Sequence, residues 1–356
     1  MVSSALPTYF LTANSADGFI NGFKSVYDAN DGWRVFLIKG GPGTGKSTFM
    51  KNVAQALYES GEEVHLVPCS SDPNSLDGVV SQSKKICFFD ATAPHILNPE
   101  YAGVCEETID LSVFWDSDKL YKEREKIIEL TDKNKELHRL ASKMISAVGQ
   151  LKRKKNKVSL MATDIDKTFD YAATLAGRFL KDGYKTGKER VIYLSAITNE
   201  GEIFINDTID KLCDRKIFIE DGFGTVAGII TSVIRDWAID KNIEIITVKN
   251  NILPSEQIDH ILIPSLSLAF VSGKEIEAAE KKINSLRFMD REVLKEHRSA
   301  VKVMDKLSAQ LTLSAVEILK KAKLNHDELE SYYVSAMDFS ALNKFTSKFT
   351  EKLLLY

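Results

Sequence analysis

The chain has 356 residues, a net charge of −3, and 44% hydrophobic and 27% charged residues. These values exclude an intrinsically disordered chain, and the length favours two domains or two fused halves over a single core. The small net charge indicates no general attraction to nucleic acid or anionic lipid, so such a contact would need a local basic patch.

The sequence carries no signal for a membrane or for secretion. No apolar run approaches the roughly 20 residues that cross a bilayer, and residues 1–7 lack a basic segment followed by an apolar one. The four cysteines form no CxxC pair and no zinc-type spacing with histidine. We therefore expect a cytoplasmic protein with reduced, mostly buried thiols.

The first hundred residues alternate short apolar runs with a helical pattern. Runs typical of buried strands occupy residues 8–12, 33–38, 63–67 and 86–89. Apolar residues recur at helical spacing from Lys46 to Glu59, before Gly61. This order predicts a βαβ unit with a parallel sheet.

From Ser117 to about Lys181 glycine and proline are sparse and charges are dense, which predicts a long helical pair turning near residues 151–158. The basic run at residues 152–157 is predicted to be the solvated tip of this helical arm, and an anion contact is the alternative.

The pattern then restarts in the same order. Residues 191–196, 199–206, 215–225, 243–248 and 268–271 follow the pattern of residues 8–13, 17–21, 34–44, 62–67 and 87–89, and a second helical stretch is predicted from Gly273. The sequence thus predicts an α/β protein made of two fused copies, residues 1–183 and 184–356. Each copy would be an α/β/α parallel-sheet core followed by a helical arm, at about 117–181 and about 274–356.

A glycine-rich loop follows the second predicted strand. It matches G-x-x-x-x-G-K-[ST] through the residues Gly40, Gly41, Pro42, Gly43, Thr44, Gly45, Lys46, Ser47 and Thr48. Glycines let backbone N–H groups approach an anion, and a helix beginning at Lys46 adds its own unpaired N–H groups. Lys46 would reach the β- and γ-phosphates, Ser47 would bind Mg²⁺, and Thr48 would cap the helix or contact the α-phosphate. The loop predicts a site for Mg²⁺ and ATP.

The second copy has lost this chemistry. Ala227 and Gly228 stand where Lys46 and Ser47 do, and Val226 replaces Gly45. Glu220 and Asp221 add negative charge that would repel phosphate. We therefore expect one working nucleotide site, with a structural or regulatory second half.

A carboxylate that holds magnesium should end a neighbouring buried strand. Asp90 follows the apolar run at residues 86–89, and Ser272 takes the corresponding place in the disabled copy. Asp90 and Ser47 are the predicted metal ligands, and an ordinary acid at a strand end is the alternative for Asp90.

The residue that would activate water is less defined, because Ala91 follows Asp90 where many ATPases have glutamate. The candidates are Asp72, Asp77, His95, Glu106 and Glu107. Loops at the carboxyl ends of parallel strands crowd the ligand crevice, which favours Asp72 and His95. A turn role for Asp72 and a surface role for His95 remain alternatives.

Three segments carry a resemblance to a bacterial family of ATP-binding proteins with duplicated P-loop cores. They are residues 40–48, 69–78 and 89–95, and the likeness extends through the Glu106-Glu107 segment and the helical arm. The resemblance implies nucleotide binding. Members commonly keep a working loop in both halves, and this chain departs from that at residues 226–228.

Three hypotheses follow for the function. The first is an ATPase that acts as a conformational switch through its helical arms. The second is a kinase in which residues 72–77 and Arg34 or Arg178 hold a phosphate acceptor. The third is an ATP-sensing module without turnover, with a protein or nucleic-acid partner on the arms; the net charge does not favour nucleic acid. The oligomeric state is left open.

Overall fold

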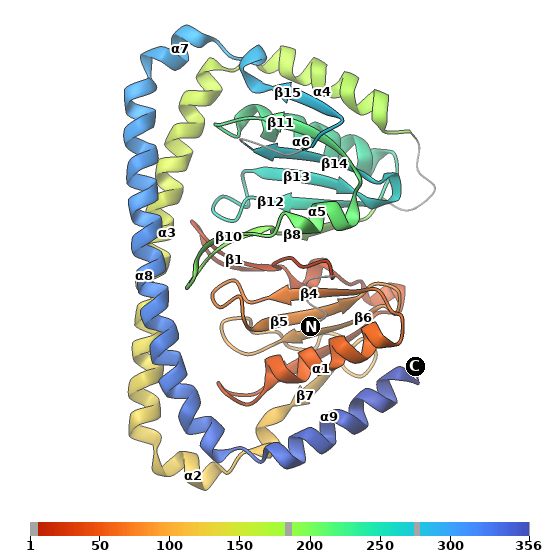
Figure 1. Ribbon diagram of the computed structural model, residues 1–356, viewed down its shortest axis with the longest axis vertical. Coiled ribbons are helices and arrows are strands. Elements are labelled where there is room, and N and C mark those ends of the chain that lie inside the picture. The colour runs from red at the N-terminus through yellow and green to blue at the C-terminus, as the bar shows by residue number, and fades with distance from the viewer. Residues whose placement is uncertain (1–5, 182–186, 274–277, 356) are drawn as a thin grey trace.

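A computed structural model describes residues 6–181, 187–273 and 278–355. The chain is α/β, with two sheets stacked beside a pair of long helices (Figure 1). Among the helices of the described residues, none is long and apolar enough to cross a membrane. The predicted division at residues 183/184 and the predicted start of the second arm near residue 274 lie outside the described residues.

The first sheet is mixed rather than parallel. Its spatial order is β4 (Val64–Pro68), β5 (Leu76–Ser81), β6 (Ile86–Asp90), β3 (Arg34–Lys39) and β7 (Glu106–Asp110). β3 runs parallel to β6 and β7, whereas β5 is antiparallel to both β4 and β6. The prediction of a parallel sheet is wrong at β5, because residues 69–75 and 82–85 are too short for the crossover that a parallel pair needs.

The second sheet repeats this order and adds one strand. It runs β15 (Lys281–Asn284), β11 (Arg215–Glu220), β14 (Leu268–Gly273), β13 (Ile258–Ile263), β12 (Ile245–Lys249) and β8 (Glu189–Ile192). The predicted helical stretch from Gly273 instead contains β15, which pairs with β11, and helix resumes only at α7 (Arg291–Glu296). Two hairpins lie between the sheets: β1 (Thr12–Ser15) with β2 (Gly18–Asn21), and β9 (Ser195–Thr198) with β10 (Gly201–Phe204).

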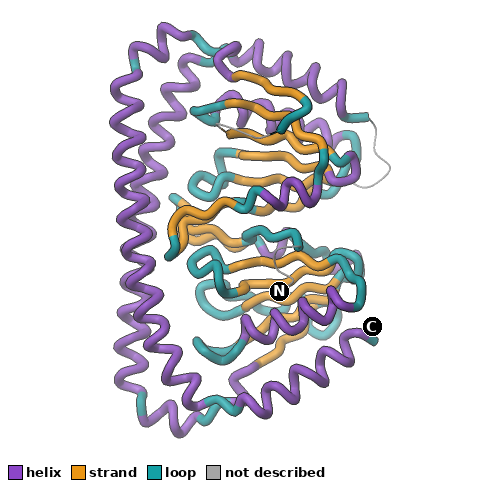
Figure 2. Tube along the Cα trace, in the orientation of Figure 1, coloured by secondary structure: helices purple, strands orange, loops and turns teal. Residues whose placement is uncertain are grey.

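Among the described residues, the four helices of the first half have counterparts in the second half, which adds the short helix α5. The helices are α1 (Lys46–Glu59), α2 (Ser117–Lys122), α3 (Arg124–Ala162) and α4 (Ile165–Phe179), then α5 (Asp207–Leu212), α6 (Thr225–Asp240), α7, α8 (Arg298–Ala336) and α9 (Phe339–Leu354). The predicted turn near residues 151–158 is wrong. α3 is unbroken there (Figure 2), because no proline interrupts it, and it ends where Asp164 caps α4 by accepting from the Lys167 N–H at 3.0 Å. The basic run at residues 152–157 therefore lies inside a helix and not at a tip.

The terminal helices are exchanged between the halves. α3 and α8 run antiparallel side by side, so each delivers the next helix to the opposite sheet (Figure 1). α9 packs against α1 on the first sheet, and α4 packs against α6 on the second. Neither outer layer is complete without a helix from the other half of the chain.

α1 and α9 cover the outer face of the first sheet and α4 and α6 that of the second, whereas the short helix α5 contributes Ile209 to the inner core. The inner faces share one core, in which Val35 and Leu37 of β3 lie in the same cluster as Ile246 and Val248 of β12. The predicted α/β/α layering is therefore wrong, because the other half of the molecule covers each inner face. Successive side chains of β3 point to opposite faces of the sheet, so this strand contributes to both cores. Phe36 and Ile38 lie in the outer core, whereas Val35 and Leu37 lie in the inner one.

Replacing Phe349 of α9 with alanine should lower the free energy of unfolding by about 2 kcal/mol. Its ring centroid lies 5.3 Å from that of Phe36, 5.5 Å from that of Phe49 and 6.0 Å from that of Phe88. Urea unfolding measures the change, with exposed Phe169 of α4 as the matched control. Equal stability of the Phe349 variant and the wild type would show that α9 does not dock on the first sheet.

Candidate functional site

The glycine-rich loop joins β3 to α1 at the carboxyl end of the first sheet. Gly43 has φ +66° and Gly45, which precedes the helix, has φ +85°, a region that residues other than glycine enter at a cost. Thr44 is buried, and its hydroxyl donates to the Gly41 carbonyl at 2.8 Å, fixing the loop from within. Thr48 is exposed on the first turn of α1.

The structure brings Lys46 and Asp90 together. Lys46 Nζ lies 3.6 Å from Asp90 Oδ2 and donates to the carbonyls of Gly40 at 3.0 Å and Gly41 at 2.9 Å. The other oxygen of Asp90, Oδ1, accepts from the Thr92 N–H at 2.9 Å. The Lys46 side chain therefore folds over the loop and hydrogen-bonds to loop carbonyls. Asp90 Oδ2 faces its ammonium group.

Ser47, the other predicted metal ligand, contacts β5, the strand beyond β6 in the first sheet. Its Oγ accepts from the N–H of Leu76, the first residue of β5, at 3.0 Å. The hydroxyl is therefore positioned by a backbone group at the end of the sheet where the loop lies.

Helix α8 lies directly on the loop. Glu330 Oε1 accepts from the Gly43 N–H at 3.2 Å. A Cβ added to Gly43 would lie 2.9 Å from the Glu330 carbonyl oxygen, and one added to Gly41 would lie 2.8 Å from the Tyr333 ring. The motif glycines are thus also required for the close approach of α8. No local pattern predicted Glu330, because it lies 287 positions from Gly43 in the sequence.

Asp72 also contacts α8. Its Oδ2 lies 3.2 Å from Lys323 Nζ, and its Oδ1 accepts from the Asn74 N–H at 3.3 Å. The Asp72 carboxylate therefore has two structural contacts, the turn that was considered for it and an ion pair with Lys323 that the sequence did not predict.

His326 lies one helical turn beyond Lys323 and faces Glu330. Its Nδ1 lies 3.9 Å from Glu330 Oε1. Burial lowers the pKa of His326, so near neutral pH the imidazole does not neutralise Glu330.

His95 is buried, so the surface role considered for it is wrong. It is 6% exposed, and its Nε2 lies 3.4 Å from Asp77 Oδ2. Burial raises the pKa of Asp77, although the neighbouring His95 acts in the opposite direction.

Glu106 and Glu107 lie at the wrong end of the sheet for a role at the loop. They pair with Val35 and Phe36 near the amino end of β3, whereas the loop follows Lys39. Glu106 is buried and accepts from the Tyr101 N–H at 2.8 Å, which is a structural contact.

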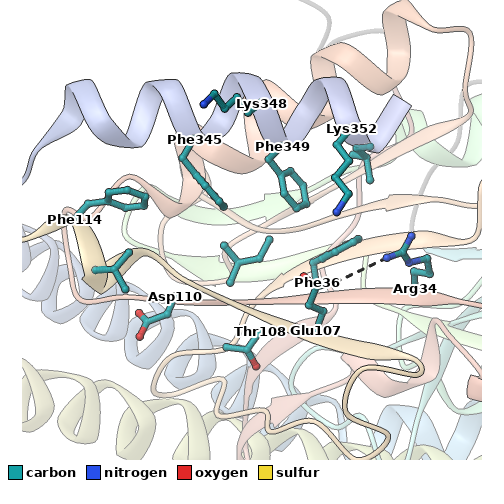
Figure 3. Close-up of a pocket in the computed structure, with 13 residues that line it drawn as sticks. Arg34, Phe36, Glu107, Thr108, Asp110, Phe114, Phe345, Lys348, Phe349 and Lys352 are labelled. Carbon is teal, nitrogen blue, oxygen red and sulfur yellow. Dashed lines mark ion pairs between the residues drawn. The ribbon is translucent and has the colours of Figure 1, made fainter. Parts of the chain in front are cut away.

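The arginines considered for a phosphate acceptor are also remote from the loop. Arg34 begins β3, and Arg178 lies on α4 over the second sheet. Arg34 lines a groove of about 570 Å³ between β7 and α9 (Figure 3), where its Nη2 lies 3.9 Å from Glu107 Oε2. Aromatic and basic side chains of α9 form the other wall, among them Phe345 and Lys348.

The basic run inside α3 is engaged by acidic groups of the described residues. Arg153 pairs with Asp17 at 2.7 Å and with Glu256 at 2.6 Å, and Lys155 pairs with Asp305 of α8 at 2.8 Å. The run therefore ties the arm to both halves instead of forming an open anion site.

The loop of the second half carries its own anion. Asp221, in the place of Gly40, accepts from the Phe223 N–H and the Ala227 N–H, both at 2.9 Å. Helix α6 starts at Thr225, the position of Thr44, so the helix begins earlier and the loop is shorter than in the first half. Both the charge and the geometry disfavour phosphate here.

Comparisons with protein-family models, with curated proteins and with solved structures gave no match to this chain.

Proposed function

We propose that the chain binds Mg-ATP at residues 40–48, hydrolyses it, and couples nucleotide binding to the position of α8. The observation that carries the proposal is the Glu330 carboxylate on the Gly43 N–H at 3.2 Å. A carboxylate oxygen in this place has the charge and the hydrogen-bond acceptor that a phosphate oxygen would have.

The residues present fit a magnesium–triphosphate complex. Lys46 would bind the β- and γ-phosphates, while Ser47 and Asp90 would hold the metal ion. The ion would supply charge neutralisation for the terminal phosphoryl group. The chain itself contributes the loop N–H groups, a lysine held 3.6 Å from Asp90, and a fixed serine hydroxyl.

The order of elements supports two tandem P-loop-like cores, residues 1–183 and 184–356, and the family resemblance agrees with this reading. Both halves run from strand through loop to helix, and the second sheet repeats the strand order of the first and adds β8. In the proposal the first half binds nucleotide and the second half is regulatory.

Coupling follows from the position of Glu330. A phosphate and this carboxylate compete for the same N–H group, so nucleotide binding favours states in which α8 has moved away. α8 spans 39 residues and packs along α3, and α9 follows it onto α1. A displacement at Glu330 would therefore reach both halves, and a protein partner on the arms could detect it.

Magnesium dependence tests the metal assignment. In wild-type protein Mg²⁺ should raise the affinity for ATP about tenfold, and Asp90→Asn should remove that gain, because the amide lacks the charge that holds the ion. Titration of a fluorescent ATP analogue with and without Mg²⁺ measures both. Glu220→Gln, another acid at a strand end but in the second half, is the control and should keep the gain. An undiminished magnesium effect in Asp90→Asn would refute the assignment.

ATP sensing without turnover is the second candidate. It is favoured by the engagement of Asp72 with Lys323 and by Ala91 in the place of a glutamate. Phosphate release from Mg-ATP without any added acceptor separates the two. Release that depends on Lys46 supports hydrolysis, and tight binding without release supports sensing.

A further inference from the structure

Three side chains with different donor atoms meet beside the loop. Cys69 follows β4, Asp77 lies on β5 and His95 lies in the loop after β6, yet one ligand atom of each lies within 4.8 Å of the others. Their spacing in the sequence matches no zinc motif, so only the fold reveals the cluster.

We propose that Cys69, Asp77 and His95 bind a zinc ion, or a transition metal with the same ligand preference. Thiolate, imidazole and carboxylate are the ligands of tetrahedral zinc, and three protein ligands with an open fourth position are typical of reactive zinc sites. Usual zinc bond lengths place tetrahedral ligand atoms about 3.3–3.6 Å apart. The His95 Nε2 to Asp77 Oδ2 distance of 3.4 Å lies in that range.

The imidazole of His95 is buried beside two aromatic rings. Its Nδ1 is buried without a hydrogen-bond partner in the described part of the chain, and its ring lies 5.0 Å from that of Phe19 and 5.7 Å from that of Phe23. The Nε2 separation from Asp77 exceeds the ordinary N–H···O range. A buried histidine is therefore aimed at a carboxylate that it does not bind tightly, as expected of two ligands of one ion.

Outer contacts orient the other two ligands. The Thr12 hydroxyl donates to Asp77 Oδ2 at 3.3 Å. The Ser71 N–H donates to Cys69 Sγ at 3.5 Å. Such supporting hydrogen bonds accompany metal ligands and fix their orientation.

The second half provides an internal comparison. Asp259 corresponds to Asp77, but Asn250 stands in the place of Cys69, and its Nδ2 donates to Asp259 Oδ1 at 3.2 Å. An amide thus satisfies the buried acid in the half whose loop is disabled. The cluster of Cys69, Asp77 and His95, with its thiol and imidazole ligands, therefore lies in the half that keeps Lys46. It is distinct from the pair of Ser47 and Asp90, whose oxygen ligands suit magnesium.

The test is metal binding by the full chain. Chelator-treated wild-type protein should take up one Zn²⁺ in competition with a chromophoric chelator. With Co²⁺ it should give the near-ultraviolet absorption of a cobalt–thiolate bond. Cys69→Ser should abolish that band, and His95→Gln should lower zinc affinity by at least about 100-fold. Cys213→Ser, a buried thiol of the second half, should leave both unchanged.

A wild-type chain without the cobalt–thiolate band would overturn the proposal, and so would a Cys69→Ser variant that keeps it. The first readout uses unaltered protein, so misfolding of a variant cannot decide the outcome. Neither readout contains nucleotide, so the result is independent of the proposed ATP site.

Discussion

Lys46→Ala is expected to lower the affinity for Mg-ATP about 100-fold and to abolish phosphate release. The side chain is the only cation supplied by the motif itself, and hydrogen bonds to charged groups contribute about 1.5–3 kcal/mol each. Its present contacts with the carbonyls of Gly40 and Gly41 are ones that a phosphate would replace. Calorimetric titration measures the affinity, and a coupled phosphate assay measures the release.

Lys51→Ala is the matched control for this variant. Lys51 lies on the same helix, is exposed, and donates to the Asn74 carbonyl at 2.8 Å. Circular dichroism and urea unfolding of both variants show whether the loop keeps its fold. Tight Mg-ATP binding by a folded Lys46→Ala protein would refute the proposed site.

Glu330→Gln should change affinity in the opposite direction and tighten Mg-ATP binding about tenfold. The carboxylate occupies the Gly43 N–H and repels phosphate, so its neutral isostere removes a competing charge. A tenfold change corresponds to about 1.4 kcal/mol, the range of one charge-assisted hydrogen bond.

Glu317→Gln is the control for the second variant. Glu317 is an exposed residue of α8, more than three helical turns before Glu330, and it pairs with Lys320. Hydrogen exchange of α8 near Glu330 should rise in wild-type protein when Mg-ATP is added. An affinity of Glu330→Gln at or below that of the wild type would argue against competition between this carboxylate and phosphate.

The sequence predicted the parts of the site that are local in the chain. The loop, its helix and the acid at the strand end all follow from patterns a few residues long, and the structure places Asp90 Oδ2 3.6 Å from Lys46 Nζ. Glu330 and Lys323 could not be predicted, because the exchange of helices brings them to the loop from the far end of the chain. The cluster of Cys69, Asp77 and His95 was missed because three separate strands and loops contribute to it.

The errors in the fold have similar causes. Apolar runs revealed β3, β4 and β6 but missed β5, and the short connections around β5 were the overlooked signal for antiparallel pairing. The turn of the first arm was misplaced because a basic run resembles a solvated tip. Asp164 and Asp338, the capping residues that begin α4 and α9, mark the true ends of the long helices.

In the proposed function the loop at residues 40–48 binds nucleotide, whereas Asp221 fills the corresponding loop of the second half. Titration calorimetry on wild-type protein measures the number of Mg-ATP molecules bound per chain. We expect a value of one. A value of two would show that the second loop also binds in spite of its carboxylate, and a value of zero would show that residues 40–48 are not a nucleotide site.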